Sequence, residues 1–128
     1  MRILGIGTDI VRVYRIEKAI KKYKFKFLYK IFTKKEIFLK KKKKNNYLSF
    51  AKRFAAKEAF VKAIGTGITN EIKFNEIEIS NDTLGKPLIS LKGKTKSVIQ
   101  KKLKLKSYKI FLSLSDDKPW AIAFVIIT

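Results

Sequence analysis

Asp9 is a carboxylate inside an otherwise apolar segment, residues 2–11. Alternation along a strand places its side chain on the same side as Gly5 and Gly7. Two glycines beside a carboxylate would leave a hollow in which a ligand or an ion could sit. An aspartate at a strand end that caps the following helix explains Asp9 equally well.

Glu58 is the second carboxylate in an apolar setting. Residues 47–64 carry an apolar stripe through Phe54, position 58 and Val61, so Glu58 lies on the face expected to be buried. Lys62 follows one helical turn later on that face, and a surface ion pair between Glu58 and Lys62 is the alternative interpretation.

Asp9 and Glu58, with Lys62 nearby, would together suit a magnesium ion. Mg²⁺ binds carboxylate oxygens and completes its octahedron with water and phosphate oxygens. Mn²⁺ accepts the same oxygen ligands.

The composition narrows the chemistry further. The 128 residues contain neither cysteine nor histidine, which excludes thiol nucleophiles, disulfides and every histidine acid, base or ligand. The 31 basic residues against 10 acidic ones give a net charge of +21, and only four of the basic residues are arginine. Lysine acts as a point charge, so an acidic protein, a polyphosphate ligand or nucleic acid could be the partner.

The elements that must position these residues follow from periodicity and turn signals. Thr33 and Glu36 have the T-x-x-E spacing of a capping box, and Gly65 ends an alanine-rich helix. The predicted order is a strand over residues 2–11, helices over 14–26, 33–40 and 47–64, a hairpin of 74–80 with 87–91, a helix over 95–105, and a hairpin of 107–115 with 120–127.

This order predicts an α+β fold, a single domain over residues 1–128 in which an antiparallel sheet packs against the long helix. No run of about 18 apolar residues occurs, so we expect a soluble, cytoplasmic protein without a membrane span. Gly65, Thr66 and Gly67 could hold a phosphate through backbone N–H groups, although a helix C-cap followed by a turn explains the same three residues.

Two blocks of the sequence resemble the signature blocks of the holo-[acyl-carrier-protein] synthase family, the small trimeric class of 4′-phosphopantetheinyl transferase. The first block is GIGTDIV over residues 5–11, and the second is RFAAKEAFVKAIGTG over residues 53–67. The segment IEISNDTLGKP over residues 77–87 supports them, and the resemblance extends in order over almost the whole chain.

The resemblance implies an enzyme that transfers 4′-phosphopantetheine from coenzyme A (CoA) to a serine of apo-acyl carrier protein. The other product is adenosine 3′,5′-bisphosphate, and the reaction supports fatty acid biosynthesis. Asp9 and Glu58 would be the magnesium ligands, bridged by the ion to the CoA pyrophosphate, and Lys62 would contact that pyrophosphate. Glu58 and a water molecule on the metal remain alternatives for deprotonating the serine.

The resemblance also implies contacts with the nucleotide end of CoA. Arg53 and Lys44 would meet the 3′-phosphate, and the remaining expected contacts are Gly65, Thr66, Pro87 and Ser113. Many family members carry histidine where this chain has Asp116, a position near the nucleotide. An aspartate there would repel the 3′-phosphate unless lysines offset its charge.

The basic surface then has an acidic partner, the acyl carrier protein. The docking residues expected on the first helix are Arg15, Lys21, Lys22, Lys24 and Lys26, with Phe25 as an apolar anchor. The resemblance further implies a homotrimer with sites shared between neighbours, and no nucleic-acid or membrane partner. A nucleic-acid-binding module, suggested by charge alone, would leave Asp9 and Glu58 unexplained, and an inactive carrier-binding homologue is disfavoured because both are present together with Lys62.

Overall fold

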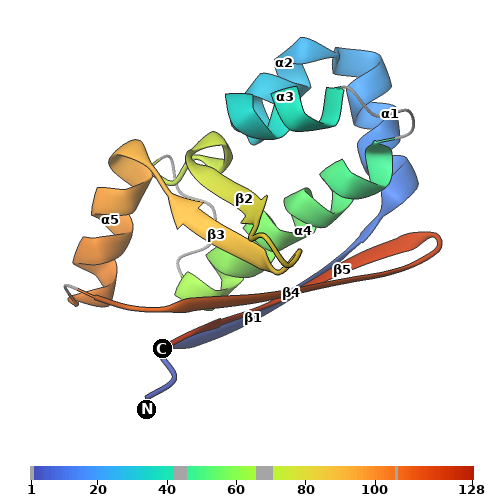
Figure 1. Cartoon of the computed structure of the whole chain (residues 1–128). Coiled ribbons are helices and arrows are strands. Elements are labelled where there is room, and N and C mark those ends of the chain that lie inside the picture. Colours follow the sequence, from blue (N-terminus) through green and yellow to red (C-terminus); the bar gives the residue numbers. More distant parts are fainter. Residues whose placement is uncertain (1, 42–45, 66–70, 106) are drawn as a thin grey trace.

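A three-stranded antiparallel sheet in the order β1–β5–β4 forms one side of the molecule (Figure 1). The computed structural model describes residues 2–41, 46–65, 71–105 and 107–128. The sheet consists of β1 (Gly5–Arg12), β4 (Ile110–Asp117) and β5 (Trp120–Ile127). A separate antiparallel hairpin pairs β2 (Ile77–Asn81) with β3 (Pro87–Leu91).

The described helices all lie on the same side of the β1–β5–β4 sheet (Figure 1). In chain order they are α1 (Val13–Tyr23), α2 (Phe25–Ile31), α3 (Lys34–Lys41), α4 (Tyr47–Ile64), the 3₁₀ turn η1 (Phe74–Glu76) and α5 (Gly93–Leu103). Helix α4 packs on the strands, so the predicted α+β class with an antiparallel sheet against the long helix is confirmed. None of these helices is both long and apolar enough to cross a membrane.

Several local signals predicted their elements correctly. Helix α4 has the predicted bounds and ends at Gly65, whose φ of 82° lies in the left-handed region. The capping box also forms, because the Thr33 N–H donates to Glu36 Oε1 at 2.8 Å and the Glu36 N–H donates to Thr33 Oγ1 at 3.2 Å.

The predicted single helix over residues 14–26 is wrong. The structure has two helices here, and Lys24 joins them with a φ of 51°. The Lys24 N–H donates to the Ile20 carbonyl and closes α1, while the Lys24 carbonyl accepts from the Leu28 N–H in α2. Lysine carries no side-chain signal for this break, so the amphipathic pattern runs on through it.

Other bounds differ from the predictions by up to three residues. Strand β2 begins at Ile77 because residues 74–76 form the 3₁₀ turn, and α5 begins and ends two residues earlier than expected. Strand β4 begins at Ile110 and extends to Asp117.

Gly5 and Gly7 allow β1 to lie against the backbone of α4. A Cβ atom added at Gly7 would overlap the carbonyl oxygen of Ala59, and one added at Gly5 would overlap that of Ala63. The predicted hollow beside Asp9 is therefore wrong at these two positions, because the helix backbone fills the space.

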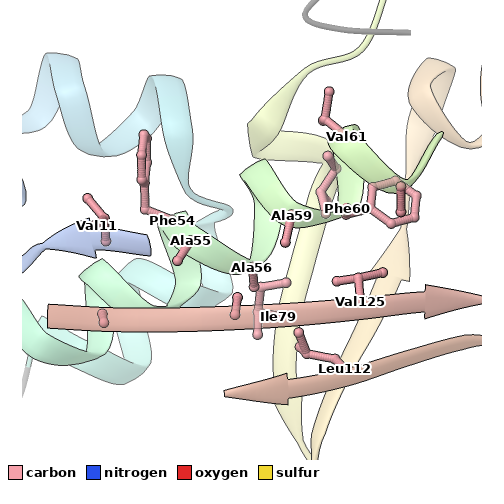
Figure 2. Close-up of a cluster of buried hydrophobic side chains, with 14 of the residues drawn as sticks. Val11, Phe54, Ala55, Ala56, Ala59, Phe60, Val61, Ile79, Leu112 and Val125 are labelled. Atoms are coloured by element: carbon pink, nitrogen blue, oxygen red, sulfur yellow. The ribbon is translucent and has the colours of Figure 1, made fainter. Parts of the chain in front are cut away.

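The hydrophobic core lies where α4 crosses the sheet. Figure 2 shows Val11, Leu112 and Val125 from the strands together with the alanines and phenylalanines of α4. Ala55, Ala56 and Ala59 of the helix are fully buried, and their small side chains suit the close approach to the strands.

A buried ion pair holds the other side of α4. Lys57 Nζ lies 2.6 Å from Glu36 Oε1 and also donates to the carbonyls of Ile31 and Phe74, at 2.8 and 3.0 Å. Burial lowers the pKa of Lys57 to about 8, although Glu36 opposes this shift. Because Glu36 Oε2 also accepts from the Ile79 N–H, the pair joins α4 to α2, α3, η1 and β2.

The close contact of β1 with α4 predicts a large cost for Gly7→Ala. The added methyl group meets backbone atoms that no side-chain rotation can move, so we expect a loss of about 3 kcal/mol or more in the free energy of unfolding. Urea unfolding measures this loss. Gly85→Ala is the control, because open space surrounds Gly85 and only its left-handed conformation would cost about 1–2 kcal/mol. Equal losses in the two variants would contradict the contact.

Candidate active site

Strand β1 and the C-terminal half of α4 bring Asp9 and Lys62 together. Lys62 Nζ lies 3.0 Å from Asp9 Oδ1 and also donates to the Thr8 carbonyl at 3.0 Å. The Asp9 side chain is 15% exposed and that of Lys62 is 56% exposed, so the lysine lies on the solvent side of the pair. Strand β1 continues to Arg12, the N-cap residue of α1, so the alternative of Asp9 as a helix cap is wrong.

Glu58 lies beside this pair and is half-buried. Burial raises the pKa of Glu58, and the nearby charge of Asp9 raises this pKa further, while Lys62 and Arg15 oppose the shift. In the described part of the chain no hydrogen bond or ion pair engages Glu58, since Lys62 pairs with Asp9. The helix-surface ion pair considered for Glu58 and Lys62 is therefore wrong.

The two carboxylates form an incomplete donor set for a divalent cation. Among the described residues no third acidic or other metal-ligating side chain joins them. A cation between Asp9 and Glu58 would relieve the repulsion that contributes to the raised pKa of Glu58. Mg²⁺ commonly keeps several water and phosphate ligands, so a site with two carboxylates fits this ion.

A second group of residues lines a cavity of about 420 Å³ where α4 begins and the β2–β3 hairpin turns. Its walls include Lys52, Arg53, Asn81 and Pro87. Two of the residues expected to contact CoA, Arg53 and Pro87, thus meet in one pocket. We call this cavity the α4–hairpin pocket.

Arg53 supplies a buried positive charge to the α4–hairpin pocket. Its guanidinium donates to Ser49 Oγ at 2.7 Å and to Asn81 Oδ1 at 3.2 Å, both neutral partners, while the buried Nε has no hydrogen-bond partner. Burial lowers the pKa of Arg53, and no carboxylate among the described residues forms an ion pair with it. A buried cation of this kind is stabilised by a bound anion.

Asp116 forms an ion pair with Lys52 beside this pocket. A neighbouring lysine thus offsets the negative charge that, according to the family resemblance, would lie near the nucleotide end of CoA. The Lys52 and Asp116 side chains are 27% and 34% exposed, so solvent still reaches both.

The family model that describes the 4′-phosphopantetheinyl transferase superfamily matches residues 5–125 of this chain. The chain belongs to this superfamily.

Relatives and solved structures of the superfamily match nearly the whole chain. A Pelagibacter ubique protein named holo-[acyl-carrier-protein] synthase is 46% identical over 127 residues, 99% of this chain and 98% of the relative. The crystal structure of the Neisseria meningitidis synthase has a TM-score of 0.87 at 38% identity and 99% coverage of both chains. The Helicobacter pylori synthase in complex with coenzyme A has a TM-score of 0.81 at 37% identity, covering 96% of this chain and 99% of that one. The resemblance identified from the sequence is confirmed.

The remaining residues expected from the superfamily resemblance lie apart from both groups. Gly65 is exposed at the end of α4, and Ser113 is exposed on the sheet face that points away from α4. Lys44 and Thr66 lie outside the described residues. The described lining of the α4–hairpin pocket includes neither Asp9 nor Glu58.

The sequence analysis did not identify the residues that hold the candidate site in place. Lys57 and Lys52 received no role, and Glu36 was assigned only to the capping box. The available signal was Lys57, which lies within an alanine-rich segment. A long charged side chain that is buried requires a partner, so Lys57 predicts a buried ion pair.

The electrostatics of the site predict the response of Glu58 to its neighbours. In metal-free protein, Asp9→Asn should lower the pKa of Glu58, because it removes a nearby negative charge. Lys62→Gln should raise that pKa, because it removes a positive charge. Carboxyl ¹³C NMR titration measures both shifts. Shifts of the same sign in the two variants would contradict the arrangement.

Proposed function

We propose that this chain transfers the 4′-phosphopantetheine group from CoA to a serine of apo-acyl carrier protein. The products are holo-acyl carrier protein, used in fatty acid biosynthesis, and adenosine 3′,5′-bisphosphate. The observation that carries this proposal is the grouping of Asp9, Glu58 and Lys62 at the β1–α4 contact, in a chain similar over 99% of its length to a holo-[acyl-carrier-protein] synthase.

Asp9 and Glu58 would hold Mg²⁺, with Mn²⁺ as an alternative. When bound, the ion neutralises charge on the CoA pyrophosphate during phosphoryl transfer. The chain's contribution is two carboxylates on rigid elements, one from a strand and one from a helix that pack backbone to backbone. These elements fix the carboxylates before the substrate binds.

Lys62 would contact the pyrophosphate. Its Nζ atom already lies at the carboxylate pair, and its side chain is 56% exposed, so the ammonium group can turn from Asp9 to a phosphate oxygen. We assign Glu58 as the acceptor of the serine proton. The chain has no histidine, and Glu58 is a half-buried carboxylate with a raised pKa and no hydrogen-bond partner among the described residues.

The α4–hairpin pocket would take the nucleotide end of CoA. Arg53 offers its buried guanidinium to the 3′-phosphate, which would supply the missing anionic partner. Pro87, which lines the same cavity, would contact the adenosine.

Removing either carboxylate should abolish transfer while the fold survives. We expect Glu58→Gln and Asp9→Asn each to lower kcat/KM by about a hundredfold or more, since each removes an anionic ligand from the proposed metal site. The assay incubates the protein with CoA, Mg²⁺ and apo-acyl carrier protein and weighs the carrier by mass spectrometry. Near-normal turnover in either variant, with an unchanged circular dichroism spectrum, would rule out that residue as a ligand.

We also propose that the active form is a homotrimer with shared sites. The face of the β1–β5–β4 sheet opposite α4 bears exposed apolar side chains, including Ile6 (56%), Ile10 (57%) and Phe124 (41%). An apolar face of this kind supports burial against other copies of the chain. The described lining of the pocket in a single copy does not include Asp9 or Glu58. Shared sites would join the α4–hairpin pocket of one copy to the carboxylates of another.

Phe124→Asp should convert the trimer to monomers, because it places a charge in the centre of the open sheet face. Light scattering should give a mass three times that of the chain for the original protein and the single-chain mass for the variant. Phe38→Asp on α3 is the control, since Phe38 is also exposed but lies away from the sheet. A fully active monomer of the unaltered protein would overturn the shared sites.

The carrier protein would dock on α1 and the start of α2. Lys22, Lys24 and Lys26 are exposed there, and Phe25 is 52% exposed beside them. Arg15, on α1, also lies near enough to Glu58 to affect its pKa, so this surface adjoins the carboxylates. An acidic carrier would be attracted electrostatically to this surface. We expect the reaction to take place in the cytoplasm.

Reversing charge on this surface should separate carrier docking from CoA binding. We choose Lys22→Glu with Lys26→Glu rather than changing Lys21, because Lys21 is paired with Glu17 at 3.2 Å. The double variant should raise the carrier KM about tenfold at low salt, and less at ~0.15 M, where the Debye length is about 8 Å. The CoA KM should stay nearly unchanged.

The matched control is Lys96→Glu with Lys101→Glu on α5, which makes the same charge change far from α1 (Figure 1). An equal rise of the carrier KM in this control would mean that net charge alone attracts the carrier. If the α1–α2 variant lost CoA binding but still docked the carrier, this surface would belong to the nucleotide site and not to the carrier site.

A further inference from the structure

We infer that the Lys52–Asp116 ion pair sets how strongly the α4–hairpin pocket binds the 3′-phosphate of a nucleotide. This inference rests on the proposed function, which makes that pocket the site for the nucleotide end of CoA.

The two cations of the pocket that are adjacent in sequence have opposite surroundings. Arg53 is buried and has only neutral hydrogen-bond partners among the described residues. Lys52, one residue earlier on α4, is partly exposed and is ion-paired with Asp116 at the end of β4. The pocket therefore combines one unpaired buried charge with one charge that is already neutralised.

The register of β4 explains why Asp116 reaches Lys52. Asp116 lies on the same side of the strand as Leu112 and Leu114, the side that faces α4. Asp117 follows on the opposite side of the strand. One carboxylate of the Asp116–Asp117 sequence is thus paired beside the pocket, and its neighbour points to the open face of the sheet.

The charges then predict two opposite effects on a phosphate in the pocket. Asp116 repels the phosphate and also restrains Lys52, so it weakens the attraction that Lys52 would otherwise exert. Lys52 attracts the phosphate and also shields it from Asp116. The pair therefore limits the affinity that the 3′-phosphate contributes. It leaves contacts with the rest of the nucleotide unchanged.

The test compares two probes, adenosine 3′,5′-bisphosphate and 5′-AMP, which differ only by the 3′-phosphate. Isothermal titration calorimetry gives the Kd of each, and the ratio of the two Kd values measures recognition of that phosphate. We expect Asp116→Asn to increase the preference for the bisphosphate on the order of threefold to tenfold, and Lys52→Gln to decrease it by a similar factor.

Two further variants separate this role from a general effect on the fold. Asp117→Asn removes the same charge from the adjacent residue and should leave the Kd ratio unchanged. Lys52→Arg keeps the charge and should retain most of the preference.

An unchanged or reduced preference in Asp116→Asn would overturn the inference, as would an equal increase in Asp117→Asn. If the unaltered protein binds both probes equally but still transfers phosphopantetheine, the inference fails and the proposed function stands. If it binds neither probe and transfers nothing, both fail together.

Discussion

The backbone contact between β1 and α4 is the constraint on which the site depends. Gly5 and Gly7 have no side chains, so the carbonyls of Ala59 and Ala63 occupy the space beside the strand. Asp9 follows on the same side of β1 and therefore meets the helix where Lys62 and Glu58 project. A larger residue at either glycine would push the helix away and separate the carboxylates. The glycines thus act through packing, and the chemistry belongs to the residues that this packing brings together.

The other flank of α4 is held by polar groups. Lys57 and Glu36 are almost fully buried, and their hydrogen bonds reach α2, α3, η1 and β2. A buried pair of this kind is costly to break, because either partner alone would leave an uncompensated charge. Helix α4 is therefore held from both sides, which positions its residues Arg53 and Glu58 relative to the hairpin and the sheet.

The sequence predicted what depends on local pattern. Helix α4, the Thr33–Glu36 capping box and the strand alternation that puts Asp9 toward the helix all follow from neighbouring residues. The sequence could not predict the features that depend on contacts between distant segments. The hollow expected beside Gly5 and Gly7 is filled by a helix that begins more than 35 residues later in the chain. The pairing of Lys52 with Asp116 joins two distant segments, and the left-handed Lys24 has no signal in its side chain.

In the proposed trimer, one active site combines the carboxylates of one copy with the α4–hairpin pocket of another. Mixing two variants that each lack one part of the proposed site tests this arrangement most directly: Glu58→Gln keeps the pocket, and Arg53→Gln keeps the carboxylates. In randomly mixed trimers each site needs Glu58 from one copy and Arg53 from its neighbour, so roughly a quarter of the original transfer activity should return. If mixed trimers are detected by native mass spectrometry and the mixture is no more active than the two variants measured separately, the shared site is contradicted.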